Sequence, residues 1–434
     1  MMFKQVIHEC IELKNRRISK AIPSYCTANM TCIEAILRHY KNKDTPFLIE
    51  ATSNQVNQFG GYTNMTPVDY MTSVYDIADR VGFKRERLML AGDHLGPLPW
   101  ADLNAEEAMR QAHTLVREFV LAGYEKIHLD TSIRLKDDPQ DMPDELIAER
   151  GVALYLTCME AWKELKARNS EAHPLSFIIG SEVPPAGGSK NGEPVKVTSG
   201  KALRHTLQMY EQKFREAGID DAWDSIVGVV VQPGVEYGSF SVRQYRREDA
   251  RELCSVLKAF PHLCFEGHST DFQFPRHLRM LAEDGVLILK VGPAITYAMR
   301  EALANMCEIE RIFINDNARS HFKEILDSVM QTYPKYWEKY YGGSDKEKRI
   351  QRKFSFLDRS RYYMADQSVR NALKRLEDNI NKLDMNPGII HQYFRNQYDR
   401  LYCNNIECNF SSLIFDYIAM QLEEYDLAAE RHSI

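Results

Sequence analysis

Short apolar runs of strand length recur eight times in the first 310 residues, and an amphipathic stretch separates each run from the next. Strands that alternate with helices predict parallel βα units. Eight such units favour a closed (β/α)8 TIM barrel over an open sheet, so the predicted fold class is α/β. The predicted strands are Pro23–Asn29, Phe47–Asn54, Leu88–His94, Lys126–Thr131, Ser176–Glu182, Ser225–Pro233, Leu263–His268 and Val286–Gly292.

Two of the intervening stretches carry clear helix signals. The segment Thr66–Val81 begins with Thr66, a good N-cap residue, and Pro67 follows at the first helical position. The segment Ala105–Leu121 repeats apolar residues at three- and four-residue spacing. Both are therefore predicted to be helices that cover the barrel.

The pattern changes after about residue 315, where strand-length apolar runs stop and Tyr, Arg, Asp and Lys become frequent. Helix patterns continue, for example at Ser368–Leu383 and Leu413–Glu423, and Gly342–Lys348 is predicted to be an exposed loop. We therefore predict a TIM-barrel domain over residues 1–315 and an α-helical C-terminal region over residues 316–434, packed on the barrel.

Charge and composition narrow the function. A net charge of −6 argues against a nucleic-acid-binding protein, whose affinity comes from clustered Lys and Arg. Residues 1–20 hold no apolar signal segment, and no stretch approaches the roughly 20 apolar residues of a membrane span. The nine cysteines are scattered without a Cys-x-x-Cys pair. We expect a cytoplasmic protein that binds neither nucleic acid nor membrane.

Polar or ionisable residues stand at the carboxyl end of each predicted strand. In a TIM barrel these ends share one rim, where active sites lie. Residues two apart on a strand face the same side, so we expect Glu50, Thr52 and Asn54 to point together, as well as His128 with Asp130. The other residues of the rim are Asp93, His94, Glu182, Gln232, Glu266, His268 and Lys290.

Asp93 and His94 are the first candidates for chemistry. A histidine that ends a buried strand offers a neutral imidazole to Zn²⁺, and the carboxylate before it could exchange protons. The alternative is a capping pair that satisfies the loop Gly96–Trp100. His268 and Glu182 at other strand ends favour the functional interpretation.

Other rim segments suit a sugar phosphate, and each also has a structural explanation. Ser269 opens a run of small residues that could receive a phosphate, or form an ordinary βα turn. The amide-rich loop Gln55–Tyr62 suits sugar hydroxyls, or could bond to itself. Glu182 leads a Pro-Pro-Ala-Gly-Gly segment that could be a lid or a linker. Lys290 could bind phosphate, pair with a carboxylate or form a Schiff base.

Six segments are long enough to identify a family. They closely resemble the signature of the Z-type subunit of D-tagatose-1,6-bisphosphate aldolase, a class II aldolase-like family, and they span nearly the whole chain. The segments are Ala51–Thr63, Gly92–Pro97, Ile127–Ser132, Phe265–Asp271, Leu289–Ala294 and Asp358–Tyr363.

The resemblance implies two kinds of function. The Z-type subunit is described as a non-catalytic partner that stabilises a Y-type class II aldolase subunit in the catabolism of tagatose, galactitol or N-acetylgalactosamine. Some relatives are described as metal-dependent epimerases that act at C4 of ketohexoses, their phosphates or related uronates. Either function implies a ketose phosphate or a similar ligand, and we expect an oligomer.

The resemblance also implies Zn²⁺ as the cofactor. Class II aldolases hold Zn²⁺ with three histidines, and a catalytic aspartate precedes the first, as Asp93 precedes His94. His268 lies where a later ligand is expected. Gln232 stands where another histidine is expected, and an amide is a poorer ligand than imidazole. Lys290–Pro293 replaces an Asn-x-Asp phosphate motif. Glu182 would then complete the metal site.

On this basis Asp93, Asp130 and Glu182 are predicted to be catalytic. Zn²⁺ would polarise the ketose carbonyl while Asp93 or Asp130 exchanges the proton of the C4 hydroxyl. The predicted metal ligands are His94, Glu182 and His268. The predicted substrate-binding residues are Asn54, Gln55, Gln232, Glu266, Ser269, Lys290 and Arg359.

Three hypotheses follow. The first is a stabilising subunit of D-tagatose-1,6-bisphosphate aldolase. The second is a self-sufficient enzyme, either a Zn²⁺-dependent epimerase that interconverts tagatose 6-phosphate and fructose 6-phosphate or an aldolase. The third is a sugar-phosphate-binding barrel without catalysis. The family description and Gln232 favour the first. The ionisable rim favours the second, because buried charge is costly unless it is paired or bound to metal.

Overall fold

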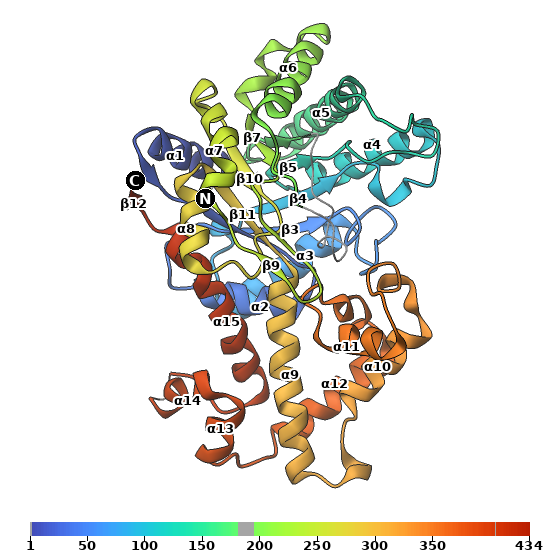
Figure 1. Cartoon of the computed structure of the whole chain (residues 1–434), viewed down its shortest axis with the longest axis vertical. Helices are drawn as coiled ribbons and strands as arrows, with labels where there is room; N and C mark the ends of the chain where they lie inside the picture. Colours follow the sequence, from blue (N-terminus) through green and yellow to red (C-terminus); the bar gives the residue numbers. More distant parts are fainter. Residues whose placement is uncertain (1, 181–194, 404) are drawn as a thin grey trace.

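Eight parallel strands close into a barrel in the order β10-β11-β2-β3-β4-β5-β6-β7 (Figure 1). The computed structural model describes residues 2–180, 195–403 and 405–434. Each predicted strand has its counterpart, so the predicted (β/α)8 TIM barrel is confirmed. The barrel strands are β2 (Ile22–Cys26), β3 (Leu48–Thr52), β4 (Leu90–Leu95), β5 (Lys126–Leu129), β6 (Ser176–Ile179), β7 (Ile226–Val231), β10 (Cys264–Gly267) and β11 (Val286–Val291).

Helices surround the barrel where the periodicity predicts them. Helix α3 (Pro67–Val81) begins with a capping box, in which the Thr66 side chain accepts a hydrogen bond from Asp69 N and the Asp69 carboxylate accepts one from Thr66 N. The predicted segment Ala105–Leu121 is helix α4. The other helices of the barrel are α2 (Met30–Tyr40), α5 (Asp144–Arg168), α6 (Gly200–Glu216), α7 (Arg247–Val256), α8 (Pro275–Glu283) and α9 (Pro293–Phe313).

An additional helix, α1 (Phe3–Asn15), closes the amino end of the barrel. Its buried side chains form a cluster with residues on the strands, among them Ile22, Leu48 and Leu287. The backbone N–H of Phe3 also donates to Glu125 Oε2 at 2.8 Å. Because this end is filled with apolar side chains, polar chemistry inside the barrel is confined to the opposite rim.

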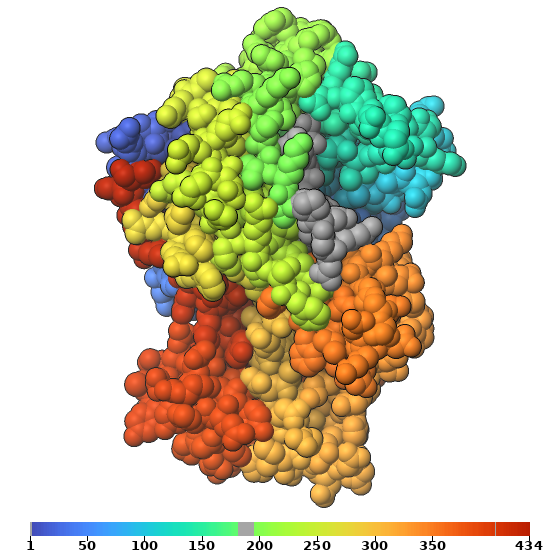
Figure 2. Space-filling view, in the orientation of Figure 1, coloured from blue at the N-terminus to red at the C-terminus, as the bar shows by residue number. Residues whose placement is uncertain are grey.

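The C-terminal region is helical, as predicted, and extends from one side of the barrel (Figure 2). Its last helix, α15 (Phe410–Ala429), returns to pack on α2, α8 and α9. A short antiparallel pair joins β1 (Ile18–Ser19) to β12 (His432–Ser433), and another joins β8 (Glu236–Tyr237) to β9 (Val242–Arg243). The helices are α10 (Phe322–Thr332), α11 (Asp345–Phe354), α12 (Gln367–Ile380), α13 (Pro387–Tyr393), α14 (Arg395–Tyr402) and α15 (Phe410–Ala429).

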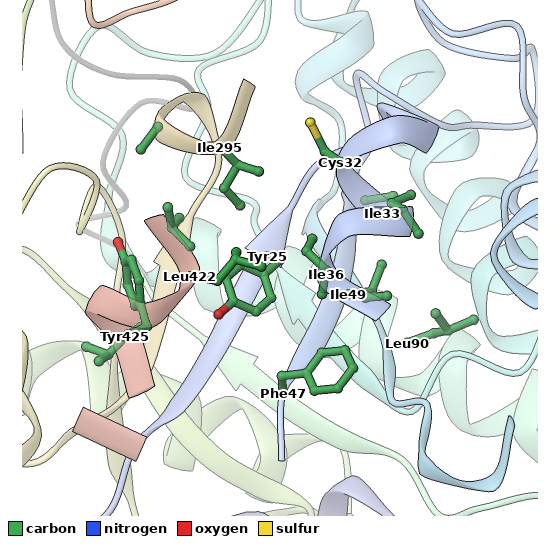
Figure 3. Packing of buried hydrophobic residues seen from close by; sticks show 14 of the residues in the cluster. Tyr25, Cys32, Ile33, Ile36, Phe47, Ile49, Leu90, Ile295, Leu422 and Tyr425 are labelled. Atoms are coloured by element: carbon green, nitrogen blue, oxygen red, sulfur yellow. The ribbon is translucent and has the colours of Figure 1, made fainter. Parts of the chain in front are cut away.

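Helix α15 belongs to the main hydrophobic core. Tyr25 of β2 lies between Leu422 of α15 and Ile36 of α2 (Figure 3). The hydroxyl of Tyr425 donates to the carbonyl oxygen of Thr270 at 2.8 Å, which ties α15 to the loop after β10. The C-terminal region therefore supports a loop of the barrel rim.

One local prediction was wrong. The predicted exposed loop Gly342–Lys348 is exposed, but helix α11 already begins at Asp345. Ser344 is its N-cap and forms a capping box with Glu347, a pattern that favours a helix start over a loop. The division into parts at residues 315 and 316 stays a prediction.

Neither a membrane-spanning helix nor a disulfide occurs among the described residues. None of their helices is long and apolar enough to cross a membrane. All nine cysteines fall within the described part of the chain, and none forms a disulfide.

We predict that Tyr425→Phe lowers the free energy of unfolding by about 1–2 kcal/mol, because the buried carbonyl of Thr270 loses a hydrogen bond. Chemical unfolding followed by circular dichroism measures the change. Tyr402→Phe is the matched control, since Tyr402 is 77% exposed. Equal stability of the Tyr425→Phe variant and the unaltered protein would contradict the prediction.

Candidate active site at the carboxyl end of the barrel

A bulge in β4 turns two consecutive polar side chains toward the barrel interior. Gly92 pairs with Ile127 and Leu95 pairs with Leu129, so β4 has one residue more than β5 between these two pairs. His94 lies in this bulge with φ 45°, in the left-handed region. Both Asp93 and His94 are buried. Such strain in a non-glycine residue is typical of functional sites.

Gly96 fixes the position of the next strand end. An added Cβ at Gly96 would lie 1.8 Å from the carbonyl oxygen of Asp130, so only glycine permits this approach. Asp130 N also donates to Leu95 O at 3.0 Å. The Gly92–Pro97 segment therefore holds Asp130 next to His94.

Below the rim, two buried lysines bind three buried carboxylates. Lys126 Nζ lies 2.8 Å from Glu50 Oε1 and 2.6 Å from Glu266 Oε2. Lys290 Nζ forms an ion pair with Asp93 and lies 3.3 Å from Glu50 Oε2. Burial opposes the charge of both lysines, but the carboxylates raise the pKa of each above its ordinary value. Both lysines are therefore charged.

Three histidine rings converge above this ion network. The ring centroid of His94 lies 5.1 Å from that of His128 and 4.8 Å from that of His268. His94 Nδ1 lies 2.7 Å from Asp130 Oδ2, and His268 Nε2 lies 2.9 Å from Glu266 Oε1. Each of these two rings is thus oriented by a carboxylate.

The three imidazoles differ in protonation. Burial lowers the pKa of His128, and it lowers that of His268 well below the ordinary value, with Lys290 adding to the effect. Burial also disfavours charge on His94, but Asp93 and Asp130 outweigh it and raise its pKa. His128 and His268 are therefore neutral, whereas His94 readily takes a proton.

The donor atoms of four residues converge within 4.8 Å of one another and could hold a metal ion. Two neutral imidazoles with two carboxylates form a ligand set that suits Zn²⁺ and similar divalent ions. His128 Nε2 is buried and has no hydrogen-bond partner among the described residues. The four residues are Asp93, His128, Glu266 and His268.

Two further observations fit a cation at this position. His128 Nδ1 is approached by His94 N at 3.1 Å and by Asp93 Oδ1 at 2.9 Å. His128 Nδ1 cannot both accept a hydrogen bond from His94 N and donate one to Asp93 Oδ1. One of the two contacts is therefore unfavourable until a cation neutralises the Asp93 carboxylate. With His94 neutral, the centre also has four carboxylates and two ammonium groups, a formal charge of −2 that one divalent ion would balance. These carboxylates belong to Glu50, Asp93, Asp130 and Glu266.

A pocket opens above the centre, and two parts of the chain line it. The barrel rim contributes Asp93, His94, His268 and Lys290, and the C-terminal region contributes a cluster of Tyr and Arg side chains. Of the four metal candidates, Asp93 and His268 thus line a polar cavity that can admit a small ligand. The residues of the C-terminal region in its wall are Tyr340, Arg359, Arg361 and Tyr362.

The structure brings together most of the predicted site. Gln55 lines the pocket and accepts a hydrogen bond from Thr52 N at 2.8 Å. Glu266 lies below the histidines rather than in the pocket wall, and it pairs with Lys126. The predicted substrate-binding residues that line the pocket are Asn54, Gln55, Ser269, Lys290 and Arg359.

Of the remaining predicted residues, Gln232 and Asp130 have other surroundings than expected. Glu182, predicted to be a ligand and a catalytic group, lies outside the described residues. The Gln232 side chain accepts from Gly234 N at 2.8 Å, so it supports its own loop. Asp130 bonds to His94 and to Ser132, which leaves it to orient His94. Their predicted roles stay untested.

Sequence reasoning missed several members of the site. His128 was expected to point to the same side of its strand as Asp130, but it was given no role. A signal was present, since Lys126, His128 and Asp130 alternate along one strand, and three ionisable groups on one face of a barrel strand are unusual in a core. Arg361 and Tyr362 belong to the family segment Asp358–Tyr363, but the sequence did not place them at the pocket, because their place depends on how the C-terminal region packs.

Comparison with known proteins assigns the family. Residues 7–430 match the model of the family described as D-tagatose-1,6-bisphosphate aldolase subunit GatZ/KbaZ-like. The chain belongs to this family. Membership supports a role related to tagatose-bisphosphate aldolase and agrees with the resemblance of the six sequence segments.

One solved structure shows the same fold, and two others are more distant matches. A probable tagatose 6 phosphate kinase from Sinorhizobium meliloti 1021 is 37% identical, with a TM-score of 0.86 over 94% of this chain and 100% of that one. The YdjI aldolase from Escherichia coli K12 is 9% identical, with a TM-score of 0.43 over 82% of this chain and 95% of the other. A fructose-bisphosphate aldolase from Campylobacter jejuni is 12% identical, with a TM-score of 0.44 over 95% and 96%.

We predict that Lys126→Met lowers the free energy of unfolding by about 3–5 kcal/mol, because Glu50 and Glu266 lose a buried counter-ion. A second substitution, Glu50→Gln, should recover part of the loss. Chemical unfolding measures both variants, and Lys374→Met on the surface serves as the control. A loss below about 1 kcal/mol would show that the network does not depend on Lys126.

Proposed function

We propose that the chain is a metal-dependent 4-epimerase of ketohexose phosphates, which interconverts tagatose 6-phosphate and fructose 6-phosphate by retro-aldol cleavage and re-addition. The observation that supports it is the pairing of a buried four-residue donor set with a separate His94–Asp130 pair beside it. The family assignment favours aldol-type chemistry on such sugars.

The ligand set would be Asp93, His128, Glu266 and His268. Bound there, a divalent ion such as Zn²⁺ would polarise the ketose carbonyl and stabilise negative charge on its oxygen. This set differs from the one expected from the sequence, because His128 takes the place given to His94.

His94 is our candidate for the proton transfer. Its Nδ1 faces Asp130, which fixes the ring and leaves Nε2 for the substrate. The raised pKa of His94 suits a group that accepts and returns a proton near neutral pH. Asp93 is less suited to act as a base, because His94 and Lys290 outweigh its burial and hold its pKa well below the ordinary range.

The reaction would proceed in three balanced steps. His94 Nε2 takes the proton of the C4 hydroxyl, the C3–C4 bond breaks, and its electron pair moves toward the C2 carbonyl oxygen. The aldehyde fragment then turns its other face toward C3. The bond re-forms, and His94 returns the proton to the C4 oxygen with inverted configuration. The pocket walls keep the two fragments together.

Lys290 does not favour a Schiff-base mechanism. A nucleophilic lysine must lose its proton, whereas three carboxylates keep Lys290 charged despite its burial. We assign Lys290 to the neutralisation of Asp93 and Glu50.

The second candidate is a stabilising subunit of D-tagatose-1,6-bisphosphate aldolase that assembles with a Y-type subunit. The family description, which names an aldolase subunit, favours it. The buried donor set favours the epimerase, because a purely structural partner gains nothing from keeping a costly cluster of charges.

The test uses the purified chain with Zn²⁺ or Mn²⁺ and follows both sugar phosphates by NMR. We expect interconversion, and we expect His94→Gln to slow it about 10²- to 10⁴-fold while metal binding is retained. His205→Gln, an exposed histidine on α6, is the matched control. No turnover by the metal-loaded chain, with stimulation of a Y-type subunit on mixing, would favour the subunit instead. Tight sugar-phosphate binding without either activity would favour a binding protein.

Metal binding should depend on pH in a defined way. Protons compete for His128 and His268, and burial holds the pKa of each below 6.5. We predict that Zn²⁺ affinity stays nearly constant from pH 8 to pH 6.5 and falls only below it, as measured by competition with a chelator. His268→Ala should weaken binding at every pH. A tenfold loss of affinity already between pH 8 and 7 would contradict the ligand assignment.

A further inference from the structure

Helix α9 follows the eighth barrel strand, and its N-terminus is a place where TIM barrels often bind a phosphate. Here an internal carboxylate fills it. Asp271 Oδ1 accepts hydrogen bonds from Gly292 N at 3.0 Å and from Ala294 N at 2.8 Å. Asp271 is also buried. Because of the two hydrogen bonds, its carboxylate already occupies the N–H groups that would otherwise bind an anion.

Positive charge stands elsewhere in the pocket, on the turn Arg359–Tyr363 of the C-terminal region. Arg359 Nη1 donates to Tyr362 Oη at 3.2 Å, and Arg361 Nη2 donates to the same oxygen at 3.0 Å. Two guanidinium groups thus share one phenol in the pocket wall. Both arginines donate to that oxygen, so neither contact uses the hydroxyl proton of Tyr362, which can donate to a ligand.

Arg361 lacks a direct counter-ion. Within the described ranges of the chain, no carboxylate lies within ion-pair distance of its guanidinium group. Its Nη1 donates to two carbonyl oxygens, of Leu357 at 2.5 Å and of Asp358 at 2.8 Å. A guanidinium that is held by neutral acceptors at a pocket wall keeps its charge available for an anionic ligand.

The turn that carries these arginines is held rigidly. Asp358 has φ 40° and is buried. Its carboxylate accepts from Thr296 Oγ1 at 2.6 Å and from Ser360 Oγ at 2.6 Å, and it lies 3.3 Å from Arg300 Nε. Since Thr296 and Arg300 belong to α9, this helix positions the turn above the barrel rim.

We infer that Arg361, with Arg359 and Tyr362, binds the anionic terminal group of the substrate, and that the N-terminus of α9 does not. The group is a phosphate ester or a carboxylate on the carbon farthest from the ketone. This inference rests on the proposed function for the identity of the sugar, but the binding site itself does not require turnover. It also moves the anion away from Ser269, where the sequence suggested it.

The experiment measures binding by calorimetry with the metal-loaded full-length chain. The probes are sorbitol 6-phosphate, gluconate and sorbitol, none of which has the ketone needed for turnover. One of the two anionic probes will bind the unaltered protein more tightly than the other. We expect Arg361→Gln to weaken the binding of that probe by about 10- to 100-fold. We expect the affinity for neutral sorbitol to change less than twofold. Arg375→Ala, an exposed arginine on α12 that donates to a backbone carbonyl, is the matched control.

A comparison of the two anionic probes identifies the group, since a phosphate site favours sorbitol 6-phosphate and a carboxylate site favours gluconate. Equal weakening of anionic and neutral probes by Arg361→Gln would overturn the inference, because it would show a general loss of structure. Unchanged affinity for both anionic probes would also overturn it. If Arg361→Gln does not fold, Arg361→Lys is compared with Arg359→Gln instead. Because Arg361→Lys keeps the charge, it should weaken the binding of the preferred anion less than Arg359→Gln does.

The test of the anion subsite does not depend on whether the chain is an epimerase. A loss of anion binding in Arg361→Gln supports the subsite even if the chain does not interconvert the sugar phosphates. Interconversion of fructose 6-phosphate with an unchanged KM in Arg361→Gln would overturn the subsite while leaving the epimerase in place.

Discussion

The ion pairs of Lys126 and Lys290 inside the barrel are the interaction on which the site depends. Carboxylates buried in a barrel core are stable only with matched positive charge. Lys126 supplies it to Glu50 and Glu266 from below, and Lys290 supplies it to Asp93 and Glu50 from the side. With these contacts formed, the bulge in β4 can place Asp93 and His94 in the interior, and the three imidazoles can converge above them.

Most of the fold could be predicted because local patterns determine it. Apolar runs ended in polar residues at each strand, and Thr66 and Pro67 marked the start of α3 within one residue. The start of α11 was missed although Ser344 and Glu347 form a capping box, because two glycines before it suggested a loop. Local signals thus worked wherever they agreed with one another.

The site was less predictable, because its ligand set depends on register. An ordinary strand would send Asp93 and His94 to opposite faces, and only the extra residue in β4 brings both inside. That shift is what lets His94 face Asp130 and leaves His128 among the metal candidates. Family resemblance pointed to strand ends that the structure brings to one pocket, but it could not show which imidazole faces which carboxylate.

The late position of α15 in the chain has a consequence for synthesis. The barrel strands are complete by Val291, but the turn with Arg361 and the Tyr425 hydroxyl that supports the loop after β10 leave the ribosome later. A nascent chain can therefore close its barrel before the C-terminal region covers the rim. At that stage the apolar surfaces of α2, α8 and α9 that pack against α15 are still exposed. During that interval the incomplete protein would be a target for chaperones, and the pocket would be assembled last.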